Sequence, residues 1–373
     1  MHLSTRYPSA LILSAFILLA LSGCRDEPPV VSRVGSTAFD GRFIDAHFHA
    51  HPHVGRGPGS SFDMAGAARA AVRMMDQHGI AAGIIMPPPF PPGRAGYDVE
   101  ELQEAVRQFP DRFAILGGGG LLNPIIHAQA EAEFVPDAVR REFAARAKSI
   151  LAAGARGFGE LTALHFSLRP QHPFEQIRPD HPLFLLLADI AGDAGVPIDL
   201  HMEAVPRDMT VPRRVHGFGG SNPPTVKANI AAFERLLGHN RRAAIIWSHA
   251  GWDNIGERTP GLMRALLRRH PNLYMSMKFQ RPGAGGVSNP LDGGRRLRPE
   301  WRQLLEEFPD RFLMANDSHI YVDIRRRSRT QGIGAARAFF RQLDGKLARS
   351  IGYENAQRLF RLQPQALPAA AAR

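Results

Sequence analysis

The sequence has one cysteine, few lysines, no repeat of fixed short period, and an apolar run near its start that is too short to cross a bilayer comfortably as a helix. The lone thiol, Cys24, excludes an internal disulfide in any compartment. The apolar run covers residues 10–21, and a membrane-spanning helix needs about 20 apolar residues. The lack of a short-period repeat argues against a solenoid or a propeller.

The positive charge is almost entirely arginine. The formal net charge is +11, yet lysine occurs only at Lys148, Lys227, Lys278 and Lys346. Arginine clusters at 295–298 and 325–327 are compatible with attraction to an anionic membrane surface. A solvated, arginine-rich surface is the simpler interpretation, and we favour it. No basic motif interleaved with aromatic residues occurs, so no nucleic-acid partner is expected.

Residues 1–23 have the pattern of a secretory signal peptide: Arg6, then the apolar run, then small residues. The segment Leu21-Ser22-Gly23-Cys24 resembles a bacterial lipobox, in which the cysteine thiol is lipidated. The alternative is an ordinary signal followed by a chance cysteine. We expect an exported lipoprotein, anchored in the membrane and facing the periplasm. Arg25 after the cysteine favours the outer membrane.

The rest of the chain divides into three parts. Residues 24–40 are polar, contain proline and lack periodicity, which predicts a tether. Residues 41–362 are expected to form one folded domain, because α/β barrels often exceed the usual size of a single core. Residues 363–373, rich in proline and alanine, are expected to be a flexible tail. Hydrophobic content of 44% and charged content of 22% are typical of a globular protein.

From residue 41 onward, short apolar runs alternate with longer segments of helical periodicity. Alternation of this kind implies a parallel sheet. Eight repeats predict a (β/α)8 TIM barrel in a single domain, with function at the C-terminal strand ends. The predicted strands are 43–47, 83–86, 113–117, 157–160, 196–201, 243–249, 272–277 and 312–316, and the clearest predicted helices are 63–78, 136–153, 182–194, 225–237, 259–270 and 300–308.

Ionisable side chains end five of these predicted strands. His47 and His49 alternate with Phe48, so they share one face of the first strand. This pair alone is weak evidence, because a histidine-rich surface loop remains an alternative. Buried ionisable groups are costly without partners, whereas several that converge can hold a cation. The side chains at the ends of the other four strands are Glu160, His201, His249 and Asp317. We therefore predict a metal site at the mouth of the barrel.

Asp45 is expected to share the face of His47, one layer deeper. There it would accept the free N–H of a ligand histidine and fix its tautomer. The alternative is a buried carboxylate paired with an arginine.

The order His-x-His, Glu, His, His, Asp on strands 1, 4, 5, 6 and 8 resembles that of the amidohydrolase superfamily over residues 41–320. Ile44-Asp45-Ala46-His47 and Ser248-His249-Ala250-Gly251 are similar to motifs of its small TatD-like and decarboxylase-like members. The resemblance implies a divalent metal cofactor, zinc in the first instance, with one or two ions. It further implies that His47, His49 and Asp317 bind a first ion, that His201 and His249 bind a second, and that Glu160 bridges them.

Two features depart from the family pattern. Asn316 precedes Asp317 where the commoner sequence is glycine-serine-aspartate, and the seventh strand ends in a charged residue, Lys278. Lys278, Arg207 and Trp252 are candidate substrate contacts, each with a purely structural role as its alternative. Arginines in the loops favour a small, anionic substrate.

These residues predict a metal-dependent hydrolase that cleaves an ester, lactone, amide or phosphoester bond with metal-activated water. Asp317 would accept the proton of the water and pass it to the leaving group. If only one ion binds, His249 would instead orient the nucleophile or stabilise the developing oxyanion. Two alternatives remain: a zinc-dependent, non-hydrolytic decarboxylase of the same superfamily, and a binding lipoprotein without catalysis.

Overall fold

A computed structural model of the protein describes residues 41–55, 60–94, 96–132, 134–168, 172–216, 221–280, 284–330 and 332–363. The predicted signal peptide, Cys24 and the tether lie outside the described residues, as does the tail from residue 364. Within the described ranges, no helix is long and apolar enough to cross a membrane.

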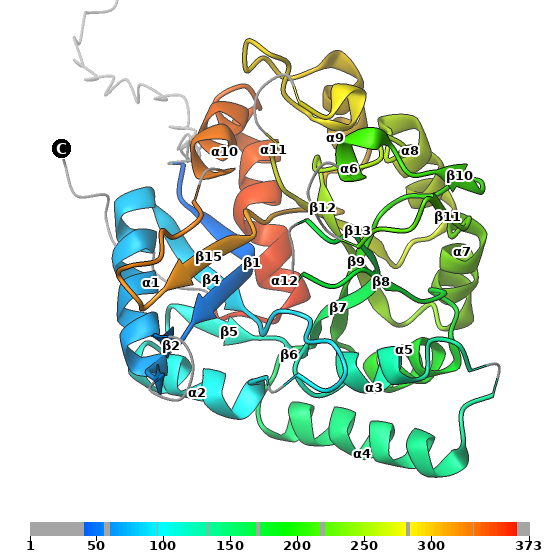
Figure 1. The fold of residues 1–373 in the computed structure, drawn as a ribbon. Coiled ribbons are helices and arrows are strands. Elements are labelled where there is room, and N and C mark those ends of the chain that lie inside the picture. Colours follow the sequence, from blue (N-terminus) through cyan, green and yellow to red (C-terminus); the bar gives the residue numbers. More distant parts are fainter. Residues whose placement is uncertain are drawn as a thin grey trace, which may run out of the picture. The chain divides into compact units, whose positions relative to one another are not determined.

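Parallel strands form the centre of the fold, with helices around them (Figure 1). Each strand predicted from the sequence has a counterpart, although the observed bounds differ by several residues at some ends. In chain order they are β1 (Phe43–His51), β4 (Ile80–Ile85), β5 (Phe113–Ile115) with β6 (Gly117–Gly118), β7 (Phe158–His165), β9 (Pro197–Met202), β12 (Ala244–Ala250), β13 (Leu273–Met277), and β14 (Phe312–Met314) with β15 (Ser318–Tyr321).

Two split strands close the ring. One sheet has the order β15-β1-β4-β5 and the other β14-β13-β12-β9-β7-β6. Only Leu116 separates β5 from β6, and residues 315–317 separate β14 from β15. The third and eighth strand positions therefore each pass from one sheet to the other, and all pairings around the ring are parallel. The predicted (β/α)8 barrel is confirmed.

Capping residues and glycines mark the ends of two helices. The Asp63 side chain accepts a hydrogen bond from the Gly66 N–H at the start of α1 (Met64–His78), which is followed by Gly79 with φ 61°. Proline is the first residue of α5 (Pro182–Ala194), and Gly195 follows that helix with φ 63°. The helices are α1 (Met64–His78), α2 (Val99–Gln108), α3 (Asn123–Ala128), α4 (Asp137–Ala152), α5 (Pro182–Ala194), α6 (Arg213–His216), α7 (Ile230–His239), α8 (Pro260–Arg269), α9 (Pro299–Glu307), α10 (Gly332–Phe340), α11 (Gly345–Arg349) and α12 (Asn355–Leu359).

Short elements occupy the loops. Two small hairpins pair β2 (His53–Val54) with β3 (Ser61–Phe62), and β10 (Met209–Thr210) with β11 (Thr225–Val226). The strand β8 (Glu175–Gln176) runs antiparallel to the end of β7. The second hairpin and α6 belong to the long connection between β9 and α7.

The buried apolar residues form two groups. The larger lies between strands and helices and includes Phe43 and Phe48 of β1. The smaller joins residues from strands across the ring, including Ile44 and Ala46, with α12. Because the pairing of β1 with β4 is irregular between Asp45 and Phe48, the alternation of faces shifts by one residue along β1. The inward face passes from Ala46 to His47.

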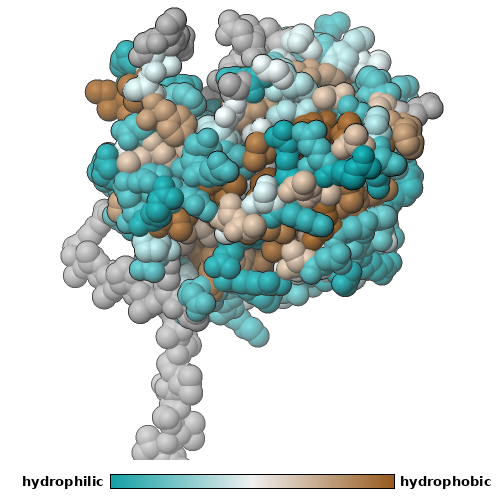
Figure 2. Space-filling view, turned by 90° about the horizontal axis from the view of Figure 1, so that it is seen from below, coloured by the Kyte–Doolittle hydropathy of each residue, from teal (hydrophilic) through white to brown (hydrophobic). Residues whose placement is uncertain are grey.

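Some of the surface arginines form ion pairs with carboxylates. Arg264 and Arg268 both bind Glu307, and Arg325 binds Asp323. On the face seen in Figure 2, hydrophilic residues predominate and hydrophobic ones gather in smaller areas between them.

Candidate metal centre

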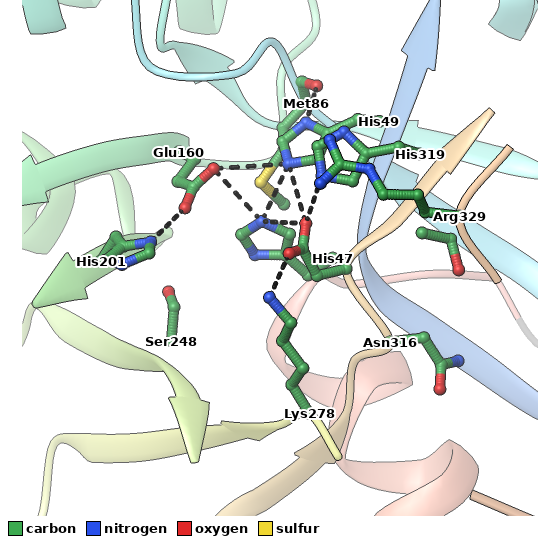
Figure 3. A network of polar contacts seen from close by, with 12 residues as sticks. His47, His49, Met86, Glu160, His201, Ser248, Lys278, Asn316, His319 and Arg329 are labelled. Atoms are coloured by element: carbon green, nitrogen blue, oxygen red, sulfur yellow. Dashed lines mark hydrogen bonds and ion pairs between the residues drawn. The ribbon is translucent and has the colours of Figure 1, made fainter. Parts of the chain in front are cut away.

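The six side chains predicted as metal ligands converge at the C-terminal strand ends. His47 and His49 come from β1, Glu160 from β7, His201 from β9 and His249 from β12. Asp317 lies in the short segment between β14 and β15. Figure 3 shows the side chains of β1, β7 and β9 turned toward one another.

The two histidines of β1 point their Nε2 atoms at the same carboxylates. These two Nε2 atoms lie 3.2 Å apart. Glu160 Oε2 is 3.5 Å from His47 Nε2 and 3.4 Å from His49 Nε2. Asp317 Oδ1 is 3.3 Å from His49 Nε2 and 3.9 Å from His47 Nε2. The donor atoms of four residues thus surround one small volume.

The other oxygen of Glu160 faces a second set of histidines. Glu160 Oε1 lies 2.7 Å from His201 Nδ1 and 3.3 Å from His249 Nε2. The His201 and His249 rings meet edge to face, with centroids 4.7 Å apart. One carboxylate therefore stands between two pairs of imidazoles, with one oxygen toward each pair.

The donor set fits a bound divalent cation. Ligand atoms about 2.0–2.1 Å from a tetrahedral zinc ion lie roughly 3.3–3.4 Å from one another, and most distances around Glu160 Oε2 are close to that value. Two groups of three residues bring one donor atom each within 4.8 Å of the others: His47, Glu160 and His249, and His47, His49 and Asp317. His249 Nδ1, the ring nitrogen that does not face Glu160, is buried and has no hydrogen-bond partner among the described residues. Buried polar atoms are usually hydrogen-bonded.

The electrostatics of the centre favour added positive charge. Burial opposes a charge on His47, but Asp199 and Glu160 outweigh burial and raise the pKa of His47 well above its usual value. Burial likewise works against ionised Glu160, yet its histidine neighbours hold the pKa of this carboxyl well below the usual range. Glu160 thus remains ionised, and its charge favours a proton on His47. A cation at the same place would take over the role of that proton.

Asp317 is held on its other side by a lysine. Burial would raise the pKa of Asp317, but Lys278 and His319 keep it well below the ordinary value. Lys278 Nζ lies 2.5 Å from Asp317 Oδ2 and 4.2 Å from the ring centroid of Trp252. Lys278 therefore lies at the centre, as an ion-paired side chain. Of the three candidate substrate contacts, Lys278 and Trp252 are brought together there.

Arg207 lies elsewhere on the mouth. Its guanidinium is 3.3 Å from Glu257 Oε1, and its side chain is 69% exposed. The ion pair explains its position without a substrate.

Two backbone conformations at ligand positions are unusual. His249 has φ 67° and Asp317 has φ 51°, values that cost energy for residues other than glycine. Each residue lies where a strand ends and the pairing is interrupted. Such conformations persist only when the surroundings hold them, and they cluster at functional sites.

Asp45 holds the unusual segment at Asp317, and the role predicted for it was wrong. Its Oδ1 accepts a hydrogen bond from the Asn316 N–H at 2.8 Å, and its Oδ2 accepts from Asn316 Nδ2 at 3.2 Å and Ser318 Oγ at 3.3 Å. Neither a ligand imidazole nor an arginine is its partner in these contacts. The shift of faces along β1 takes Asp45 out of the row of His47 and toward the eighth strand position.

Asp199 takes the role that was expected of Asp45. It is fully buried on β9, and its carboxylate oxygens lie 3.3 Å from His47 Nδ1. Ser248 Oγ donates to Asp199 Oδ1 at 2.6 Å. On the neighbouring histidine, His49 Nδ1 lies 3.0 Å from the Met86 carbonyl oxygen. Both imidazoles of β1 are thus oriented through Nδ1, which leaves Nε2 facing the centre.

His319 contacts Asp317 and His51 contacts His319, and neither histidine was predicted as part of the centre. His319 Nε2 lies 3.0 Å from Asp317 Oδ1, and His319 Nδ1 lies 2.8 Å from His51 Nε2. The rings of His51 and His319 stack at 5.1 Å. His51 therefore belongs to the wall of the centre, and its signal in the sequence was its even spacing from His47 and His49.

Comparison with known protein families gives a match over most of the chain. The family model described as Amidohydrolase matches residues 44–362. No curated protein sequence matches the chain.

Three solved structures illustrate its distant similarities. A dihydroorotase from Campylobacter jejuni is 14% identical, with a TM-score of 0.44 and 87% of this chain and 84% of that chain covered. A variant of an organophosphorus hydrolase from Deinococcus radiodurans is 15% identical, with a TM-score of 0.46 and coverages of 86% and 92%. A 4-oxalomesaconate hydratase from Rhodopseudomonas palustris is 12% identical, with a TM-score of 0.47 and coverages of 86% and 95%.

The family model spans the whole barrel, from the first strand to the end of the last helix. The histidines and carboxylates at the strand ends all lie within the matched residues. This chain belongs to the amidohydrolase family.

Proposed function

We propose that the protein is a metal-dependent hydrolase with a two-ion centre, most simply zinc, that cleaves an ester, lactone, amide or phosphoester bond. The observation that carries the proposal is the position of Glu160. Its Oε2 faces His47 and His49 while its Oε1 faces His201 and His249. A carboxylate placed in this way suits two cations, one on each side.

In this proposal His47, His49 and Asp317 would hold one ion, His201 and His249 would hold the other, and Glu160 would be a ligand of both. When bound, such ions lower the pKa of a water molecule toward 7 and polarise the oxygen of the scissile group. The side chains of the chain supply the remaining functions. Asp199 and the Met86 carbonyl oxygen orient the two imidazoles of β1.

Asp317 is the proposed proton carrier. Its Oδ1 faces the histidines of the centre while its Oδ2 lies on Lys278. It would take the proton of the attacking water and give it to the leaving group. The pair with Lys278 favours the ionised carboxylate, the form that can accept a proton.

A zinc-dependent decarboxylase of the same family is the second candidate. One ion suffices for that reaction, so it leaves the contacts of Glu160 with His201 and His249 without a purpose. Hydrolysis gives both oxygens of Glu160 a role, and we favour it for that reason. A binding protein without catalysis is disfavoured by the convergence of all six donor residues.

The experiment is a metal analysis of purified protein followed by an activity screen. Lactones, esters, amides, phosphoesters and carboxylated aromatics are tested with and without added Zn²⁺ or Mn²⁺. Metal-dependent release of an alcohol, amine or acid supports hydrolysis. Release of CO₂ with one ion per chain supports the decarboxylase. No turnover in any class by fully loaded protein supports a binding role.

We also propose export and anchoring through a lipid on Cys24. The support is the sequence of residues 1–24 alone. Replacing Cys24 by alanine should leave the precursor uncleaved or release the protein from the membrane fraction. A wild-type protein that is cleaved at another site and recovered in the soluble fraction would exclude the anchor.

A further inference from the structure

We infer that Lys278 and Trp252 form a binding site for an anionic group of the substrate, next to the proposed metal centre. The inference rests on the proposed function, because it names the class of substrate for that site. Lys278 directly follows β13 and Trp252 follows β12, so the ends of two neighbouring strands of the barrel supply the pair.

The lysine is held in place at the edge of the centre. Its backbone N–H donates to the Ala250 carbonyl oxygen at 2.9 Å. Its Nζ lies 2.5 Å from Asp317 Oδ2 and 4.2 Å from the Trp252 ring centroid. The backbone N–H of Trp252 donates to the His249 carbonyl oxygen at 2.9 Å. The ammonium is thus fixed by one carboxylate and one aromatic face.

The ammonium retains capacity for another acceptor. An ammonium has three N–H donors, and its contact with Asp317 uses one of them. The Lys278 side chain is 16% exposed and that of Asp317 is 13% exposed, so solvent reaches both groups. The aromatic ring of Trp252 limits where an incoming group can lie.

The charge of the centre sets the sign of the ligand. Glu160, Asp317, Asp199 and Asp45 contribute four formal negative charges and Lys278 one positive charge. Two divalent cations would add four positive charges, which leaves an excess of one. A carboxylate near the scissile bond would reduce that excess and accept hydrogen bonds from Lys278. The substrate class is therefore a small carboxylic acid whose carboxylate lies close to the bond that is cleaved.

The test compares binding of matched acids to zinc-loaded protein by calorimetric titration. Malonate, succinate and glutarate are each paired with their half-amide, in which one carboxylate becomes a neutral carboxamide. One carboxylate can bind metal in both members, so the difference within a pair reports a second anion site. We expect at least one acid to bind about tenfold or more tightly than its half-amide, as for one charge-assisted hydrogen bond.

Variants assign the preference to a residue. Lys278→Met should reduce it to about twofold or less while leaving half-amide binding in place, and Lys278→Arg should keep part of it. Lys227→Met is the matched control, because Lys227 is also paired with an aspartate, Asp208 at 2.8 Å, but is 78% exposed. Zinc content is measured in every variant, and only fully loaded protein is compared.

The outcomes distinguish failure of the anion site from failure of the proposed function. No preference in wild type for any of the three pairs, or a preference that survives in Lys278→Met, overturns the anion site. A preference that depends on Lys278 in a protein that hydrolyses nothing supports the anion site and contradicts the proposed function. Hydrolysis confined to neutral substrates, with no preference in binding, contradicts the anion site alone.

Discussion

The contact between Asp199 and His47 gives a prediction that does not require the substrate. In Asp199→Asn the amide has nearly the shape of the carboxylate, and its oxygen can still accept a hydrogen bond from Ser248 or His47. What is lost is the negative charge 3.3 Å from His47 Nδ1. Since Asp199 is fully buried, solvent cannot replace that charge.

The size of the effect follows from the role of such a partner. Loss of the group that orients a ligand histidine typically costs 10–100-fold in metal affinity, or about 1.4–2.7 kcal/mol. The zinc affinity of Asp199→Asn should fall by that factor in competition with a chromophoric chelator. Ser248→Ala should cost less, because the carboxylate remains.

Asp189→Asn provides the control. Asp189 also pairs with a histidine, His239 at 3.0 Å, but both side chains are largely at the surface, so zinc affinity should not change. An unchanged affinity in a folded Asp199→Asn protein would refute the idea that Asp199 supports the centre through His47.

Three further predictions concern chemistry, packing and pH. Asp317→Asn should retain much of the metal while turnover falls ~10²–10⁴-fold; near-normal turnover would move the proton-carrying role to His249 or Glu160. Gly159→Ala would place a Cβ 2.8 Å from that of Asp199. Thermal unfolding should therefore show a loss of about 1–3 kcal/mol in stability, and chelator titration should show weaker zinc binding. Gly238→Ala is the control, because no atom lies within 4 Å of the added Cβ. Burial and the nearby charge of Glu160 raise the pKa of Glu175 to about 7, so its contribution to stability is present below pH 4.5 and is lost as the pH rises through 7. Glu175→Gln should therefore flatten the stability–pH curve over that window by up to about 3 kcal/mol, and an unchanged slope would contradict the raised pKa.

The barrel and its six donor residues could be predicted because local signals were strong. Apolar runs that end in histidine or a carboxylate mark strand ends, and strand ends meet at the mouth of a parallel barrel. The helix α2 was not among the clearest predicted helices, although Asp98 and Glu101 form a capping box at its start, a signal that can be read from sequence.

The supporting residues were harder to predict because they depend on contacts between distant strands. The role of Asp45 depended on a regular alternation along β1, and an irregular pairing at that strand reversed its face. Asp199 lies two residues before His201, so its proximity to the centre was visible, but its partner His47 was not. The ion pair of Lys278 with Asp317 joins the residue after β13 to the segment between β14 and β15. No local sequence pattern predicts this contact.

The most direct test of the proposed centre is the metal content of the wild-type protein and of Glu160→Gln. The amide keeps the size of the side chain and removes the charge that faces both pairs of histidines. Wild-type protein loaded with Zn²⁺ and freed of excess metal should hold two ions per chain, and Glu160→Gln should hold one or fewer. Two ions retained by Glu160→Gln, or fewer than two bound by wild type, would contradict the bridging role of Glu160.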